Sequence, residues 1–155
     1  MNELIELLQR LNFKISSCES ITGGLFVQEL TSIAGASQYF NGGIVAYSDE
    51  AKINITKIKK QTIEKYGAVS KECALEMAVN SQNMFKTEIA ISFTGNAGPK
   101  TMENKPIGLV YVGIVINDKT WCETFQFVGN RNEIRTQVVE QAIIILKKIL
   151  QNFKK

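Results

Sequence analysis

The sequence contains no histidine among its 155 residues. This absence excludes a Ser-His-Asp triad and histidine-ligated zinc hydrolysis, so a nucleophilic serine here must take its base from lysine, tyrosine or a carboxylate. Cysteine is scarce, with Cys18, Cys73 and Cys122 scattered along the chain and no CxxC spacing. The sequence therefore predicts neither a disulfide framework nor a metal site, and we expect the three thiols to be reduced and buried.

Long apolar runs are also missing. No stretch approaches the roughly 20 residues that cross a bilayer, and the N-terminus, with Asn2, Glu3 and Glu6, lacks the basic start of a signal peptide. We therefore expect a cytoplasmic protein without a membrane partner.

Arginine is also scarce, and most of the positive charges are lysines. The net charge is +3. The densest basic stretch, with lysines at 57, 59, 60 and 65, has no interleaved aromatic residues. Such a run is typical of a solvated face rather than a nucleic-acid surface. We expect no nucleic-acid partner.

The length and the hydrophobic content of 45% fit one domain spanning residues 1–155. Apolar residues recur alternately with helical and with strand periodicity from end to end. The late strands, 108–116 and 120–128, are separated by only three polar residues and should form an antiparallel hairpin. The sequence thus predicts an α/β fold, a single domain of three layers with a mixed β-sheet flanked by helices.

Three helix starts carry capping signals. Thr22 can cap a helix with Leu25 and Phe26 on its buried face, and Ser70 precedes a helix expected over 70–81. Asn130, followed by Glu133, predicts a capping box at the start of the last helix.

Polar or glycine-rich loops follow three of the expected strands, namely Ser20–Gly24, Tyr47–Lys52 and Thr94–Gly98. Ligands in open α/β sheets bind at the carboxyl ends of strands, so these loops are expected to form one site. The first loop combines a serine hydroxyl with the backbone N–H groups of Gly23 and Gly24, which is the equipment of an acyl-transfer site. Together with Gly95, these glycines are candidate oxyanion donors.

Four blocks of the sequence resemble, in order and spacing, the C-terminal domain of the CinA family, the nicotinamide-nucleotide amidase that also occurs as a stand-alone protein. They are Glu19-Ser20-x-Thr22-Gly23-Gly24, Tyr39-Phe40-x-Gly42-Gly43-Ile44-Val45-Ala46-Tyr47-Ser48-x-Glu50-Ala51-Lys52, Gly67-Ala68-Val69-Ser70 and Thr94-Gly95-x-Ala97-Gly98-Pro99. Two later blocks also look like the family's pattern, Lys105-Pro106-x-Gly108 and Gly129-Asn130-Arg131-x-x-x-Arg135. The resemblance covers essentially the whole chain.

The resemblance implies deamidation of nicotinamide mononucleotide to nicotinic acid mononucleotide and ammonia, with no metal and no cofactor. It places the nucleophile on Ser20, the base on Lys52 and a proton donor or relay on Tyr47. Lysine acts as a base only when neutral, which burial or a nearby positive charge favours. The implied substrate-binding residues are Glu19, Thr22, Gly23, Gly24, Thr94, Gly95, Asn96 and Arg135. The family also suggests a homo-oligomer.

Each of these residues also fits an ordinary structural role. A serine before a helix is usually a turn residue, a lysine such as Lys52 is usually solvated, and Tyr47 can be a half-buried strand aromatic. Thr94 can close a turn, and Arg135 can pair with a carboxylate or a neighbouring subunit.

The chain departs from the family's pattern at two places. Ile21 stands where the family usually has cysteine, which disfavours a cysteine nucleophile at this position and leaves the serine proposal intact. The segment Lys100–Asn104 replaces further glycines and puts substrate affinity in question. The alternative function is therefore a non-catalytic nucleotide-binding or regulatory module of the same fold.

Overall fold

A computed structural model describes residues 1–153 of the chain. The helices, including one short 3-10 turn, alternate with strands along most of the sequence. The helical elements are α1 (Asn2–Leu11), α2 (Leu25–Thr31), η1 (Ala36–Gln38), α3 (Asp49–Asn54), α4 (Lys60–Tyr66), α5 (Lys71–Phe85) and α6 (Arg131–Gln151). The strands are β1 (Ile15–Glu19), β2 (Phe40–Val45), β3 (Ile89–Gly95), β4 (Leu109–Ile116) and β5 (Lys119–Gln126).

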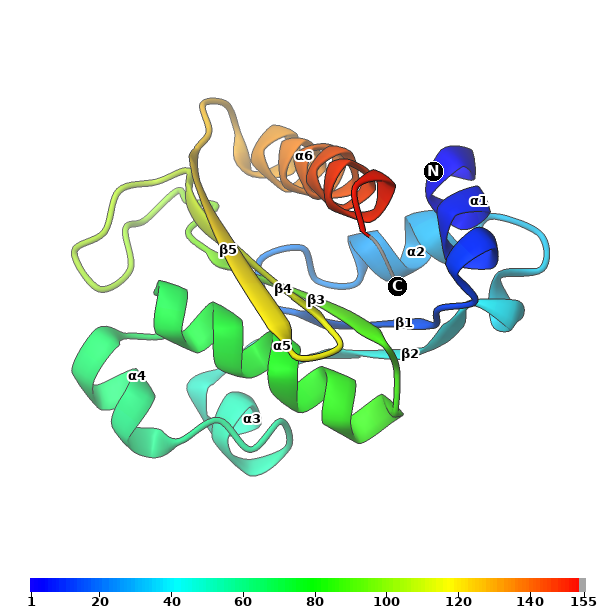
Figure 1. Cartoon of the computed structure of the whole chain (residues 1–155). Helices are drawn as coiled ribbons and strands as arrows, with labels where there is room; N and C mark the ends of the chain where they lie inside the picture. The colour runs from blue at the N-terminus through cyan, green and yellow to red at the C-terminus, as the bar shows by residue number, and fades with distance from the viewer. Residues whose placement is uncertain (154–155) are drawn as a thin grey trace.

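The five strands form one mixed sheet in the order β2-β1-β3-β4-β5. Strand β1 pairs in parallel with β2 and with β3, whereas β4 pairs antiparallel with β3 and with β5. The carboxyl ends of β1, β2 and β3 therefore meet at one edge of the sheet (Figure 1). The predicted α/β fold with a mixed sheet and a late hairpin is confirmed.

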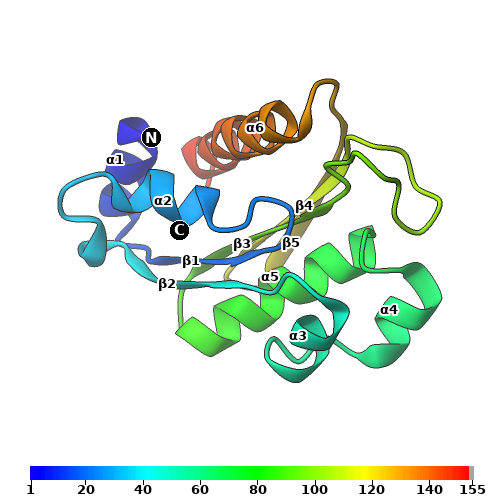
Figure 2. The ribbon, with the colours of Figure 1, turned by 180° about the vertical axis from the view of Figure 1, so that it is seen from behind.

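Helices cover both faces of the sheet. Helices α1, α2 and α6 pack on one face, and α3, α4 and α5 on the other, so that the molecule has three layers (Figures 1 and 2). The first face holds the larger apolar core, and the second holds two smaller clusters, one of which includes Cys18, Cys73 and Met77. All five residues of β1 are buried, because this strand is covered on both sides. No helix among the described residues is long and apolar enough to cross a membrane.

Two of the three predicted helix caps are present. The Ser70 hydroxyl accepts the Cys73 N–H at the start of α5, and Asn130 and Glu133 form a reciprocal capping box on α6. Each cap satisfies backbone N–H groups that a helix start leaves without partners.

The prediction that Thr22 caps the next helix is wrong. Helix α2 begins at Leu25, its N-cap residue is Gly24, and the buried Thr22 hydroxyl has no hydrogen-bond partner. The buried carboxylate of Glu19 takes the N–H groups of this helix start instead. A carboxylate is the stronger partner here, because it accepts charge-assisted bonds at the positive end of the helix.

The prediction for the cysteines holds for two of the three. Cys18 and Cys73 are buried free thiols, while Cys122 is partly exposed. It lies on β5, one of the two edge strands of the sheet.

Candidate functional site

A cavity of about 450 Å³ opens at the carboxyl ends of the three parallel strands. We call it the cleft. Its walls come from all three predicted loops and include Ser20, Tyr47, Lys52, Thr94, Gly95 and Asn96. Two further segments complete the walls, the turn before α5 with Ala68 and Val69, and the loop from Ala97 to Met102.

Ser20 and Lys52 meet inside the cleft. The Lys52 Nζ donates a hydrogen bond to the Ser20 Oγ at 3.1 Å. The two residues are only 9% and 3% exposed. Among the described residues no carboxylate lies within 4.0 Å of the Lys52 Nζ, so the serine hydroxyl is its one hydrogen-bond partner there.

Helix α3 carries Lys52 into the cleft. Its N-cap residue is Ser48, whose hydroxyl accepts the Ala51 N–H at 3.0 Å, and Lys52 is its buried residue. Burial raises the pKa values of the Cys18 and Cys73 thiols to about 12, an effect that the charge of Lys52 opposes in both. Both thiols belong to the apolar cluster on the face of the sheet that α5 covers, which is also the face of α3 (Figure 1).

The turn after β1 fixes Ser20. The Ser20 N–H donates to the Phe93 carbonyl on β3 at 2.9 Å, and its carbonyl accepts the Gly23 N–H at 3.1 Å. The Gly24 N–H donates to the Glu19 carboxylate at 3.0 Å. The N–H groups of Gly23 and Gly24, expected as oxyanion donors, are therefore already occupied.

The N–H groups of Ile21 and Thr22 are the unoccupied donors of this turn. Neither donates to an atom of the part of the chain that the structure describes. Both directly follow the serine, and Ile21 lines the cleft.

The remaining predicted binding residues support the walls. The Glu19 carboxylate accepts N–H groups from Phe26 at 3.2 Å and Val27 at 3.0 Å in addition to that of Gly24, is fully buried and does not line the cleft. The Thr94 hydroxyl donates to the Ala68 carbonyl at 2.6 Å, and the Asn96 side chain bonds Lys105 and Gly98. These side chains hold backbone segments in place.

The two arginines of α6 occupy different sites. Arg131 lines the cleft, where its Nη1 donates to the Gly98 carbonyl at 2.7 Å and its Nη2 to the Tyr47 hydroxyl. Arg135 lies one turn later and donates to the Thr22 carbonyl at 2.8 Å from outside the cleft. Sequence analysis selected Arg135 and missed Arg131, although the capping signal at Asn130 places Arg131 at the very start of the helix.

Tyr47 stands at the mouth of the cleft. Its side chain follows the end of β2 and the residue is 57% exposed. Its hydroxyl contacts Arg131 and forms no hydrogen bond with Ser20 or Lys52. The tyrosine therefore joins the wall that Arg131 forms.

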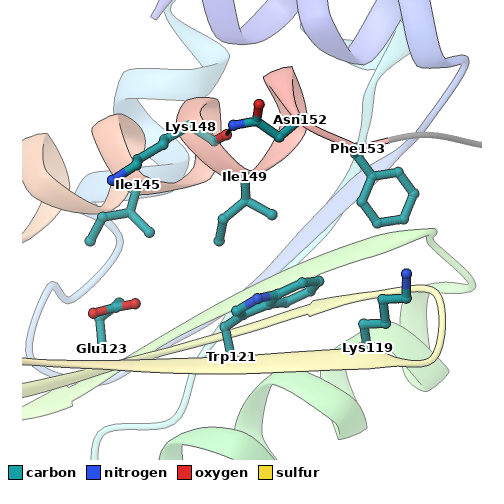
Figure 3. Close-up of a pocket in the computed structure, with 8 residues that line it drawn as sticks. All are labelled: Lys119, Trp121, Glu123, Ile145, Lys148, Ile149, Asn152 and Phe153. Carbon is teal, nitrogen blue, oxygen red and sulfur yellow. Dashed lines mark hydrogen bonds between the residues drawn. The ribbon is translucent and has the colours of Figure 1, made fainter.

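A larger cavity, of about 610 Å³, lies between β5 and α6. Trp121 forms its floor and faces Ile145, Ile149 and Phe153 of the helical layer (Figure 3). No hydroxyl or thiol side chain lines it. The cleft, although smaller, combines a buried serine hydroxyl with a buried lysine amine.

The fold and the site together define an α/β protein with a buried serine–lysine pair at the ends of parallel strands. Residues 1–150 match the sequence profile of the CinA C-terminal domain. The chain belongs to this family.

Individual relatives agree with this assignment. Protein MG115 of Mycoplasma genitalium is 41% identical over 152 residues, which cover 98% of this chain and 93% of that protein. A CinA-like protein of Kosmotoga olearia is 41% identical over 148 residues, which cover 95% of this chain and 36% of the relative. The crystal structure of the competence damage-inducible protein A of Klebsiella pneumoniae superposes with a TM-score of 0.96 at 27% identity, covering 99% of this chain and 96% of that one.

The relatives differ in length. The chain spans 37% of the length of competence-damage inducible relatives from Thermoanaerobacter, but nearly all of the Mycoplasma protein. The similarity to the longer relatives therefore concerns one part of each of them.

Proposed function

We propose that this chain is an amidohydrolase that converts nicotinamide mononucleotide to nicotinic acid mononucleotide and ammonia. The observation that carries the proposal is the buried 3.1 Å hydrogen bond between the Lys52 Nζ and the Ser20 Oγ inside the cleft. Family membership adds support, because the resemblance described above implies the same pair of residues for this reaction.

The first half of the proposed reaction releases ammonia. Neutral Lys52 takes the proton of the Ser20 hydroxyl, and the Ser20 Oγ attacks the carboxamide carbon. The tetrahedral oxyanion accepts hydrogen bonds from the Ile21 and Thr22 N–H groups, each worth on the order of 3 kcal/mol of transition-state energy. The lysine ammonium then returns the proton to the departing nitrogen, so that ammonia leaves and a serine ester remains.

The second half regenerates the enzyme. Lys52 takes a proton from water, the hydroxide attacks the ester carbon, and the proton returns to the Ser20 Oγ as the carboxylic acid leaves. No metal and no cofactor enters either half. The hydrogen bond between the Lys52 Nζ and the Ser20 Oγ supports the role of Lys52 as the base, because it places the amine within reach of the proton that is transferred.

We assign the phosphate group of the substrate to Arg131 rather than to Arg135. Arg131 and the exposed Lys100 both line the cleft, whereas the guanidinium of Arg135 donates to the Thr22 carbonyl. A guanidinium and an ammonium at one opening favour a phosphate, since charge-assisted hydrogen bonds are stronger than neutral ones. In this proposal the hydroxyl of Tyr47 orients Arg131.

An ammonia-release assay with the purified chain tests the proposal. The substrate is nicotinamide mononucleotide, the pH range is 6 to 9, and Ser20→Ala is the control for contaminating amidases. Release by the natural sequence and none by Ser20→Ala supports the proposal. Folded protein that releases no ammonia across this range overturns it.

A non-catalytic nucleotide-binding module is the second candidate. It is favoured by the position of Tyr47, whose hydroxyl contacts Arg131 and leaves the reacting pair without a second proton donor. This candidate predicts saturable binding of a pyridine nucleotide without turnover. Calorimetry that detects no binding of any pyridine nucleotide would exclude it.

A further inference from the structure

Two walls of the cleft come from distant parts of the chain, and hydrogen bonds from the two side chains of one ion pair join them. Glu103 and Lys105, in the loop between β3 and β4, lie with their charged atoms 3.0 Å apart. The Glu103 carboxylate accepts the Ala68 N–H at 2.7 Å and the Val69 N–H at 3.2 Å. The Lys105 Nζ donates to the carbonyls of Tyr66, at 2.8 Å, and Val69. We call this pair the clamp.

The backbone at the clamp is shaped to receive it. Gly67 has a φ of +86°, and a Cβ there would lie 2.1 Å from the Glu103 Oε2. Only glycine leaves room for the carboxylate and also adopts this φ without strain. The turn from Gly67 to Ser70 is therefore built around the carboxylate of a residue more than 30 positions away.

The clamped turn lines the cleft. Ala68 and Val69 face the same cavity as Ser20, Lys52 and the loop that carries Lys100. The end of β3 reinforces the connection, since the Thr94 hydroxyl donates to the Ala68 carbonyl at 2.6 Å.

None of the clamp's hydrogen bonds involves Ser20 or Lys52. The serine is held by the turn after β1 and the lysine by α3. Loss of the clamp therefore leaves the reacting pair in place and removes the hydrogen bonds to the Ala68 and Val69 N–H groups.

We propose that Glu103 and Lys105 are positioning residues that fix the Ala68–Val69 wall and thereby set the fit of the substrate in the cleft. Neither Glu103 nor Lys105 touches a reacting atom. Its kinetic consequence rests on the amidase proposed above, whereas the fixing of the wall does not.

Glu103→Gln is the principal test. The amide retains one acceptor oxygen but turns an NH₂ group toward donors, namely the Lys105 ammonium and a backbone N–H. We expect KM for nicotinamide mononucleotide to rise about tenfold while kcat changes less than about threefold, because a displaced wall weakens binding of ground state and transition state alike. Lys105→Met is the second variant, to be used if Glu103→Gln does not fold. It should likewise raise KM and leave kcat nearly unchanged.

Glu76→Gln is the matched control. Glu76 also accepts two hydrogen bonds from a preceding segment, from the Lys59 N–H at 3.0 Å and the Thr62 hydroxyl at 3.1 Å. Its side chain is 25% exposed, against 27% for Glu103, and it does not line the cleft. If Glu103→Gln acted only through a loss of local stability, Glu76→Gln should change KM to the same extent.

Amide hydrogen exchange supplies a readout that needs no activity. The Ala68 and Val69 amides should exchange at least about tenfold faster in Glu103→Gln and at their original rate in Glu76→Gln. Unchanged exchange at these amides, or an unchanged KM in an active enzyme, would overturn the inference. If the natural sequence releases no ammonia, the amidase proposal fails, and the exchange rates alone decide for or against the clamp.

Discussion

Lys52 reaches across 32 positions of sequence to hydrogen-bond the hydroxyl of Ser20, and the bond is buried. The two residues follow neighbouring strands, β1 and β2, so the order of the sheet brings them together. Their contact makes the serine the first residue to test.

Replacement of Ser20 by alanine should lower ammonia release by at least about 10³-fold, because the nucleophile is lost. The fold should persist, with unfolding in urea showing a loss of about 1–3 kcal/mol from the unpaired Lys52 amine. Ser17→Ala is the control, since the buried Ser17 hydroxyl, on the strand that precedes Ser20, has no hydrogen-bond partner among the described residues. A Ser20→Ala enzyme with normal kcat would show that Ser20 is only a turn residue.

Lys52→Met should abolish turnover to a similar extent, because methionine keeps the length and apolar stem of the side chain but cannot accept a proton. Lys57→Met, just beyond the same helix and exposed, should retain full activity. Steady-state ammonia release measures both variants. Activity of Lys52→Met within tenfold of the natural enzyme would eliminate Lys52 as the base.

Arg131→Ala should raise KM for nicotinamide mononucleotide by about 10- to 100-fold, the worth of a charge-assisted hydrogen bond of about 1.5–3 kcal/mol. With nicotinamide riboside, which lacks the phosphate, the same variant should lose much less. Arg135→Ala should leave both KM values unchanged within about twofold and lower the unfolding temperature, because its guanidinium supports the Thr22 carbonyl. The reverse pattern would restore Arg135 as the phosphate ligand.

Glu19→Gln should lower the free energy of unfolding by about 2–3 kcal/mol, because the charged acceptor of three N–H groups at the start of α2 is lost from a buried site. Urea unfolding measures the change. Glu29→Gln, on the exposed face of the same helix, should be neutral. A Glu19→Gln variant of full stability but raised KM would instead support direct contact with the substrate.

Stability should fall as the pH rises above 9. Burial raises the pKa values of Cys18 and Cys73 from 9.0 to about 12, against the opposing charge of Lys52. Between these values the folded protein keeps protons that the unfolded chain loses, so each thiol lowers the free energy of unfolding by about 1.4 kcal/mol per pH unit, while below pH 9 its contribution is complete.

Urea unfolding at several pH values between 8 and 11, under reducing conditions, measures this slope. A variant with alanine at both positions should have the shallower slope, whatever its absolute stability. Equal slopes for the variant and the natural sequence would contradict the assignment.

The sequence predicted the features that depend on neighbouring residues. The caps at Ser70 and Asn130 and the late hairpin are confirmed, because each follows from a few consecutive side chains. The strand-end loops that carry Ser20 and Lys52 were also found from local patterns.

Features that depend on distant packing were missed. Thr22 does not cap α2, because the carboxylate of Glu19, at the end of β1, accepts the N–H groups at the start of this helix. The choice between Arg131 and Arg135 depends on how α6 is rotated against the cleft, which spacing along one helix does not reveal. The clamp joins Glu103 to Ala68 across 35 positions and leaves no periodic signal.

The three-layer arrangement has a consequence for how activity arises. Ser20 directly follows β1, whose last residue, Glu19, holds the start of α2 on one face of the sheet, while Lys52 belongs to α3 on the other face (Figure 2). Neither layer alone contains both members of the serine–lysine pair. The recovery of activity during refolding should therefore report the moment at which both halves of the molecule have closed on the sheet, a step that the return of helical signal alone would not reveal.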